Sequence, residues 1–190
     1  MHLPQSTRGL TLIEVILAIA LFSILASIAA TSWTQLVSSS RHTEMVNSTH
    51  RMFAAARSHA VHHKTLTTIC PLSASGQCFD DWSQPISIFP DSNNDKRPDN
   101  ASIHRTFNLS STNSILTSRT AGRGYFQFAA DGMSHGTMGS LIACSVGGDR
   151  VRMSYLALNI GGRLRTLSDE DQDGIITLPW GTTVSCPLPW

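Results

Sequence analysis

The stretch that decides the fold is RGLTLIEVILAIALFSILASIAATSW, residues 8–33. From Val15 to Ala30 every residue is apolar or a serine, and no charged residue lies between Glu14 and Arg41. Because an α-helix rises about 1.5 Å per residue, about 20 such residues cross the ~30 Å hydrocarbon core of a bilayer. We therefore predict a membrane-spanning helix over residues 10–36.

The charges that flank this helix predict its orientation. Arg8 precedes the apolar run and no basic residue follows it directly, a distribution that places the N-terminus in the cytoplasm. Two simple interpretations of this segment are a secretory signal cut after Ala30 and a plain signal anchor. Neither explains Glu14, because a carboxylate at the start of a membrane segment is costly and usually marks a partner or a function.

Residues 8–14 resemble the class III signal of type IV pilins and type II secretion pseudopilins. In those families a short basic leader and a glycine precede a phenylalanine, Thr-Leu-Ile-Glu and an apolar helix; here Leu10 replaces the phenylalanine. The resemblance implies that prepilin peptidase removes the leader, residues 1–9, by cutting after Gly9 on the cytoplasmic side. It also implies that Leu10 becomes an N-methylated N-terminus and that the helix is kept, so that the subunit is a single-pass inner-membrane protein with a periplasmic head before it joins a pilus or pseudopilus.

The resemblance also gives Glu14 a role in assembly. In a filament the apolar helices pack together away from water, and a carboxylate buried among them needs a cation. The α-amino group of Leu10 in a neighbouring subunit is the natural partner. Pairing Leu10 with Glu14 would set the register between subunits, since either charge alone would be strongly unfavourable there.

The rest of the chain predicts an α+β head, residues 37–190, that includes the second half of the helix. After Trp33 no glycine or proline occurs before Pro71, and apolar residues from Met45 to Ala60 recur near helical spacing. One helix from about Leu10 to His62 therefore has a transmembrane half and an amphipathic half. Short β-like runs then predict a mainly antiparallel sheet packed on the helix: Leu66–Cys70, Ile86–Phe89, Ile103–Leu109, Tyr125–Phe128, Ser140–Ser145 and Val151–Ile160.

The body of the chain resembles the pilin-like branch that contains the minor pilin FimT and the secretion pseudopilin GspH. The matching segments are Met52–Ala60, Thr68–Cys70, Phe89–Asp95, Phe128–Gly132 and Asn159–Arg165. With the N-terminal motif, the resemblance spans most of residues 8–165. It implies a minor filament subunit whose partners are other pilins or pseudopilins, prepilin peptidase and the inner membrane.

Gly162, Arg163 and Arg165 form the candidate DNA-binding site. In a strand or an extended loop the two arginines lie on the same face about 7 Å apart, close to the spacing of successive phosphates along one DNA strand. Gly162 lets the backbone approach a ligand closely. In FimT-type pilins a C-terminal Gly-Arg-x-Arg motif is associated with binding DNA during natural transformation, and these residues match that motif.

Other interpretations of the two arginines stay open at this point. They are a solvated pair, or a pair that forms salt bridges with the acidic residues at 169–173. The patch is larger if the fold gathers the remaining arginines of this region, which are Arg119, Arg123, Arg150 and Arg152.

The four cysteines, Cys70, Cys78, Cys144 and Cys186, predict disulfide bonds rather than a metal site. None forms a CxxC pair, and the preceding membrane segment would place them in an oxidising compartment. Three pairings are possible. We prefer Cys70 with Cys78, which closes a short loop, and Cys144 with Cys186, which ties down the C-terminus.

Other motifs do not support catalysis, a metal or a cofactor. Residues 169–174, DEDQDG, open like a calcium loop, but Trp180 stands where such loops carry a bidentate glutamate; residues 91–95 match that pattern more weakly. His59 and His63 share a helix face without the glutamate of a zinc-peptidase motif. The net charge is only +1, and no nucleophile elbow, P-loop or carboxylate dyad is present.

We therefore predict a FimT-like minor type IV pilin that takes part in pilus assembly and in DNA binding and uptake, and that is not an enzyme. The alternative is a GspH-like minor pseudopilin of the type II secretion system with no DNA role.

Overall fold

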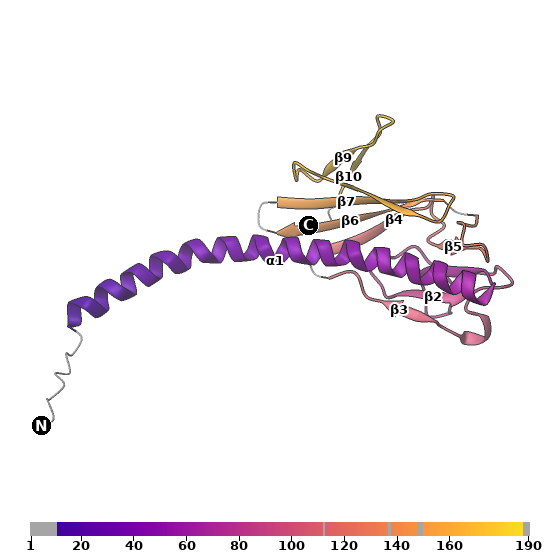
Figure 1. The fold of residues 1–190 in the computed structure, drawn as a ribbon, viewed down its shortest axis with the longest axis horizontal. Helices are drawn as coiled ribbons and strands as arrows, with labels where there is room; N and C mark the ends of the chain where they lie inside the picture. Colours follow the sequence, from indigo (N-terminus) through magenta and orange to yellow (C-terminus); the bar gives the residue numbers. More distant parts are fainter. Residues whose placement is uncertain (1–10, 112, 137, 148–149, 188–190) are drawn as a thin grey trace, which may run out of the picture.

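A computed structural model describes residues 11–111, 113–136, 138–147 and 150–187, without the side chains of residues 28–32 and 34. One long helix, α1, runs from Leu12 to His63 and extends well beyond a head built of β-strands (Figure 1). This helix confirms the one predicted from the sequence. The sequence also predicts that residues 10–36 span a membrane. In the part of the chain that the structure describes, no helix combines the length and apolar character needed to cross one.

Both ends of α1 have recognisable caps. Thr11 precedes the helix in an extended conformation, and its side chain accepts a hydrogen bond from the backbone N–H of Glu14. At the other end Lys64 adopts the left-handed conformation, with φ 51°, and donates its N–H to the carbonyl of Ala60. The chain then turns directly into the first strand.

Two four-stranded antiparallel sheets form most of the head. The first has the order β3-β2-β1-β5, with β1 at Thr67–Pro71, β2 at Ile86–Pro90, β3 at Arg105–Phe107 and β5 at Phe126–Phe128. The second has the order β4-β6-β7-β8, with β4 at Ser114–Arg119, β6 at Ser140–Gly147, β7 at Arg150–Leu158 and β8 at Leu164–Ser168. A hairpin of β9, Ile175–Thr177, and β10, Thr183–Ser185, lies on the far side of the second sheet from α1 (Figure 1). A short 3₁₀ turn, Asp99–Ala101, connects β2 and β3.

The second sheet is covered on both faces by apolar residues. On one face a large cluster packs α1 against both sheets; Met52, Phe53 and Phe126 belong to it, and none is more than 3% exposed. The ring centroids of Phe53 and Phe126 are 5.1 Å apart in an edge-to-face arrangement. On the other face a smaller cluster joins β6 and β7 to the C-terminal hairpin through Ile142, Cys144, Met153, Tyr155, Ile176, Leu178 and Val184.

His42 fastens the middle of α1 to the second sheet. Its Nδ1 lies 3.1 Å from Ser145 Oγ and its Nε2 lies 2.9 Å from Ser154 Oγ. Burial, and to a smaller extent the positive charge of Arg152, lowers the pKa of His42 to about 4. The imidazole is therefore neutral in the folded protein near neutral pH.

Two more histidines of α1 bond to threonine hydroxyls in the same way. His50 Nε2 lies 2.7 Å from Thr166 Oγ1 in β8, and His59 Nδ1 lies 3.0 Å from Thr67 Oγ1 in β1. These bonds, with the one from His42, fix the rotation of the helix over both sheets, because each is directional and comes from a different turn.

Two disulfides close the head. Cys70 pairs with Cys78 and Cys144 pairs with Cys186, which is the pairing preferred from the sequence. The second bond joins β6 to the segment after β10, across 42 residues of sequence. It therefore holds the C-terminal hairpin on the sheet.

Candidate functional site

The outer half of α1 offers an assembly surface. Glu14 lies in its first turn and is exposed, and large apolar side chains around it are exposed as well. Examples are Leu12 at 79% and Phe22 at 75%. Gly9 and Leu10, the predicted processing site and assembly partner, lie outside the described residues. An apolar surface of this extent requires a membrane or other helices to cover it.

The candidate DNA-binding residues lie in and after the turn between β7 and β8. Within this turn two hydrogen bonds join Asn159 and Arg163. The backbone N–H of Asn159 donates to Arg163 O at 3.0 Å, and the side-chain Oδ1 of Asn159 accepts the backbone N–H of Arg163 at 2.9 Å. Gly162 has φ +70°, and a Cβ built on it would lie 2.3 Å from the carbonyl oxygen of Gly132. Gly162 is therefore required by both its conformation and its close contact with a second turn.

Arg163 and Arg165 are both exposed. Arg165 pairs with Ala157 on the face of the sheet away from α1, whereas its neighbours Leu164 and Thr166 face the helix. Arg163 precedes the first residue of β8, so a shared face for the two guanidinium groups stays a prediction. Since β8 is an edge strand of its sheet, both arginines are accessible to an extended partner.

The acidic residues downstream do not neutralise these arginines. Among the residues that the structure describes, the only ion pair joins Arg51 to Glu44, at 2.5 Å. The acidic side chains at 169–173 bond within their own loop, where Asp169 accepts the backbone N–H groups of Gln172 and Gly174 at 2.9 and 2.8 Å. Of the interpretations left open by the sequence, the salt-bridged pair has no support in the described part of the chain.

Two other arginines of the region lie apart from this turn. Arg152 pairs with Ser145 and lies five residues along β7 from Ala157, about 17 Å away. Arg119 stands on β4, the opposite edge of the same sheet. The sequence left open whether the fold gathers these arginines at the site, and the fold does not bring Arg119 or Arg152 to the turn.

A basic groove lies beside the turn on the side of α1. It measures about 830 Å³, and no carboxylate lines it. Its lining comes from α1 and from the start of β8: His50, Phe53, Ala54, Arg57, Ser58, Val61, His62, Gly162, Arg163 and Leu164. The sequence analysis did not connect Arg57 with Arg163, because more than a hundred residues separate them and only the tertiary fold brings them together.

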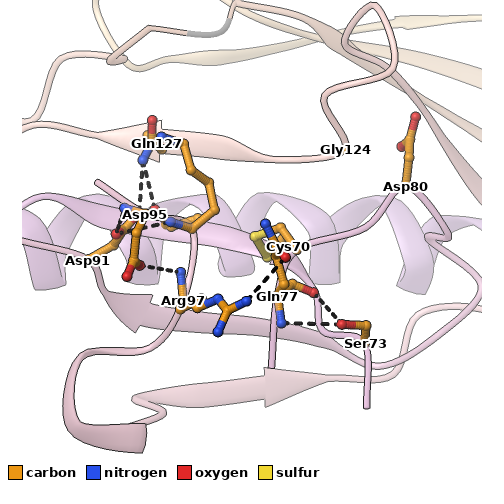
Figure 2. The surroundings of a disulfide bond; sticks show 12 residues. Cys70, Ser73, Gln77, Asp80, Asp91, Asp95, Arg97, Gly124 and Gln127 are labelled. Atoms are coloured by element: carbon orange, nitrogen blue, oxygen red, sulfur yellow. Dashed lines mark hydrogen bonds between the residues drawn. A yellow bond between two sulfur atoms is a disulfide. The ribbon is translucent and has the colours of Figure 1, made fainter. Parts of the chain in front are cut away.

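The two loops with a calcium-like sequence differ in structure. In the C-terminal one, ligand atoms of Asp169, Asp171 and Asp173 lie within 4.8 Å of one another, the one such acidic or histidine group among the described residues. In the loop 91–97, by contrast, Asp91 is fully buried. It accepts a hydrogen bond from Thr68 Oγ1 at 2.7 Å. It also accepts one from Gln127 Nε2 at 3.1 Å, and Figure 2 shows Gln127 beside this loop. Asp91 therefore anchors that loop to the first sheet.

Comparison with protein-family models identifies the family of this chain. The model described as type II transport protein GspH matches residues 45–162, more than half of the chain. The chain belongs to the GspH family. The prokaryotic N-terminal methylation motif matches residues 5–30, which implies processing by prepilin peptidase, anchoring in the inner membrane and assembly with other pilins.

One solved structure supports this assignment of the fold. The type IV minor pilin FimU of Pseudomonas aeruginosa (strain PAO1) is 19% identical, with a TM-score of 0.50, covering 72% of this chain and 95% of FimU. A second crystal form of FimU gives 20% identity and a TM-score of 0.47, covering 70% of this chain and 97% of that one. No curated protein matches the sequence. As a member of the GspH family with a pilin-like fold, the chain is a minor pilin or pseudopilin of a type IV pilus or a type II secretion system.

The family match covers only part of the candidate site. It begins at Met45, within the packed half of α1, and ends at Gly162. Arg163, Arg165, the acidic loop and the β9–β10 hairpin all lie after the matched segment.

Proposed function

We propose that this chain is a FimT-like minor type IV pilin that binds DNA through Arg163 and Arg165 and serves DNA uptake in natural transformation. The observation that carries the proposal is a pair of exposed arginines, Arg163 in the turn before the edge strand β8 and Arg165 in that strand, with no acidic partner among the described residues. Guanidinium groups in such a position bind phosphate well. Contacts of this kind are to the DNA backbone, so binding should be independent of base sequence and sensitive to salt.

The assembly part of the proposal concerns the predicted processing site. Cutting after Gly9 leaves Leu10 as the N-terminus, on the cytoplasmic side of a single-pass anchor whose head is periplasmic. The amine of Leu10 then pairs with Glu14 of the adjacent subunit. The exposed position of Glu14 in the first turn of α1 supports this, because the carboxylate is accessible to another molecule.

DNA binding is tested with the full chain in a zwitterionic detergent, by mobility shift of a short duplex over a range of salt concentrations. The Arg163→Gln/Arg165→Gln double variant should lose most of its affinity, and the slope of log K against log salt should fall by about 1.8, since each phosphate contact contributes about 0.9. Arg97→Gln/Arg105→Gln is the matched control, because it removes two exposed arginines from the other side of the head.

The second candidate function, a GspH-like pseudopilin of the type II secretion system, is favoured by one observation: the family match ends immediately before the two arginines. That function needs no DNA contact. If the wild-type chain gives no shift at low salt, or if both double variants bind equally well, the secretion function is preferred.

A further inference from the structure

The basic groove beside the β7–β8 turn contains a cation that lacks a counterion. Arg57 is half-buried on α1, and no other described residue accepts a hydrogen bond from its guanidinium group or forms an ion pair with it. The groove that it lines contains Arg163 and two histidines but no carboxylate. Because a partly desolvated charge is unfavourable without a partner, this arrangement favours the binding of an anion.

Three backbone segments hold Arg57 and Arg163 at the same groove. A Cβ on Gly132 would lie 3.0 Å from Arg57 Nε and 2.9 Å from Val61 Cγ2, so α1 packs directly on the turn that contains Gly132. The carbonyl of Gly132 in turn packs against Gly162, the residue before Arg163. Both arginines therefore line the same groove, and an anion bound there would be attracted by two positive charges.

We propose that this groove holds a phosphate of the DNA backbone, and that Arg57 is a DNA contact acting together with Arg163. The proposal rests on the proposed DNA-binding function. Arg165, on the face of β8 away from α1, is then free to contact an adjacent phosphate. The groove is large enough for a phosphate with its sugar, at about 830 Å³, and its apolar wall of Phe53 and Val61 suits the sugar better than it suits a hydrated ion.

The position of the groove favours DNA over a lipid headgroup as the source of phosphate. Arg57 lies 21 residues after Leu36, the last residue of the predicted membrane segment, so along α1 it stands about 30 Å beyond the bilayer boundary. A headgroup phosphate does not reach that distance, whereas DNA outside the membrane does.

The test compares Arg57→Gln with Arg41→Gln in the full chain in zwitterionic detergent, with a short DNA duplex as the probe. Arg41 is an exposed arginine of the same helix, about 24 Å away, so both variants lose one charge. Arg57→Gln should reduce the salt slope by about 0.9, whereas Arg41→Gln should leave it unchanged. Combining Arg57→Gln with Arg163→Gln should reduce the slope little more than either change alone, because both residues contact one phosphate.

A second measurement separates this inference from the proposed function. Inorganic phosphate should raise the melting temperature of the wild type more than that of Arg57→Gln, while Arg57→Lys, which keeps the charge and checks folding, should retain most of the effect. If Arg57→Gln binds DNA like Arg41→Gln while the changes at Arg163 and Arg165 weaken binding, the groove is not a DNA contact although DNA binding stands. If the wild type binds no DNA, the proposed function and the DNA contact in the groove are both wrong. If inorganic phosphate still stabilises the wild type but not Arg57→Gln, the groove binds an anion other than DNA.

Discussion

The two halves of α1 have the same backbone conformation and opposite relations to their surroundings. In the outer half Phe22 is 75% exposed, whereas in the inner half Phe53 is 3% exposed and packs against the aromatic residues of β5. The two glutamates of the helix differ in the same way. Glu14, in the outer half, forms no ion pair with another described residue, whereas Glu44, in the inner half, pairs with Arg51.

This difference shows that the inner half of α1 belongs to the folded head, whereas the outer half is available for contacts with other molecules. The inner half has a polar and an apolar face, and the apolar face is satisfied within the subunit. The outer half exposes many large apolar side chains, so its stability depends on contacts with other molecules. The predictions below test where this division lies.

The largest effect is expected from Glu14→Ala. Leaving the N-terminal amine of a neighbouring subunit buried without a partner costs about 3–5 kcal/mol per contact, which should reduce incorporation into filaments at least 100-fold. Glu44→Ala, the same change in the inner half, should incorporate normally. Immunoblots of sheared filaments and of membranes measure the ratio, with mass spectrometry to verify cleavage. Normal filament content of Glu14→Ala would exclude the Leu10–Glu14 contact.

Phe53→Ala should destabilise the head by about 3–5 kcal/mol, because it leaves a cavity between α1 and β5. Phe22→Ala in the outer half should change the unfolding free energy by less than about 0.5 kcal/mol. Urea unfolding of the full chain in detergent, followed by circular dichroism, compares them. Equal destabilisation by the two changes would mean that the halves of α1 unfold together and that the division proposed above is wrong.

The smallest expected effect is the pH dependence of stability that His42 causes in the inner half of α1. The folded pKa of His42 is about 4, below its ordinary value of 6.5, so the unfolded chain binds a proton that the folded chain does not. Stability should therefore be lost as the pH falls from about 6.5 towards 4, by about 1–2 kcal/mol for this residue after allowance for solvent access. His42→Asn should flatten the dependence, and exposed His135→Asn is the control. An unchanged slope in His42→Asn would contradict this assignment.

The elements with a strong local pattern could be predicted from the sequence. The long run without glycine or proline specified α1, and alternating apolar residues specified β5 and β7. The strand β4 was not predicted, because Ser114–Arg119 contains only two strongly apolar residues and is an edge strand. The hairpin β9–β10 was missed because each strand has three residues, and their stability comes from packing and the Cys144–Cys186 bond.

The candidate site was predictable only where it is continuous in sequence. Gly162, Arg163 and Arg165 form a short motif, and their position after a β-run was sufficient to propose an exposed turn. Arg57 carries no such signal: on the helix it is one of several basic residues outside the apolar stripe. Its relation to the motif depends on the contact between two glycines, Gly132 and Gly162, which no pattern in one sequence indicates.

The position of β8 at the edge of its sheet has a consequence for aggregation. Unpaired backbone groups along such an edge can template the addition of a strand from another chain, and charged side chains are a common means of preventing this. Arg165 occupies the second position of β8, where its charge disfavours the addition of a strand from another chain. Replacing Arg165 with valine would remove a charge and also leave an apolar edge strand that favours aggregation. For this reason the DNA-binding test uses glutamine at this position.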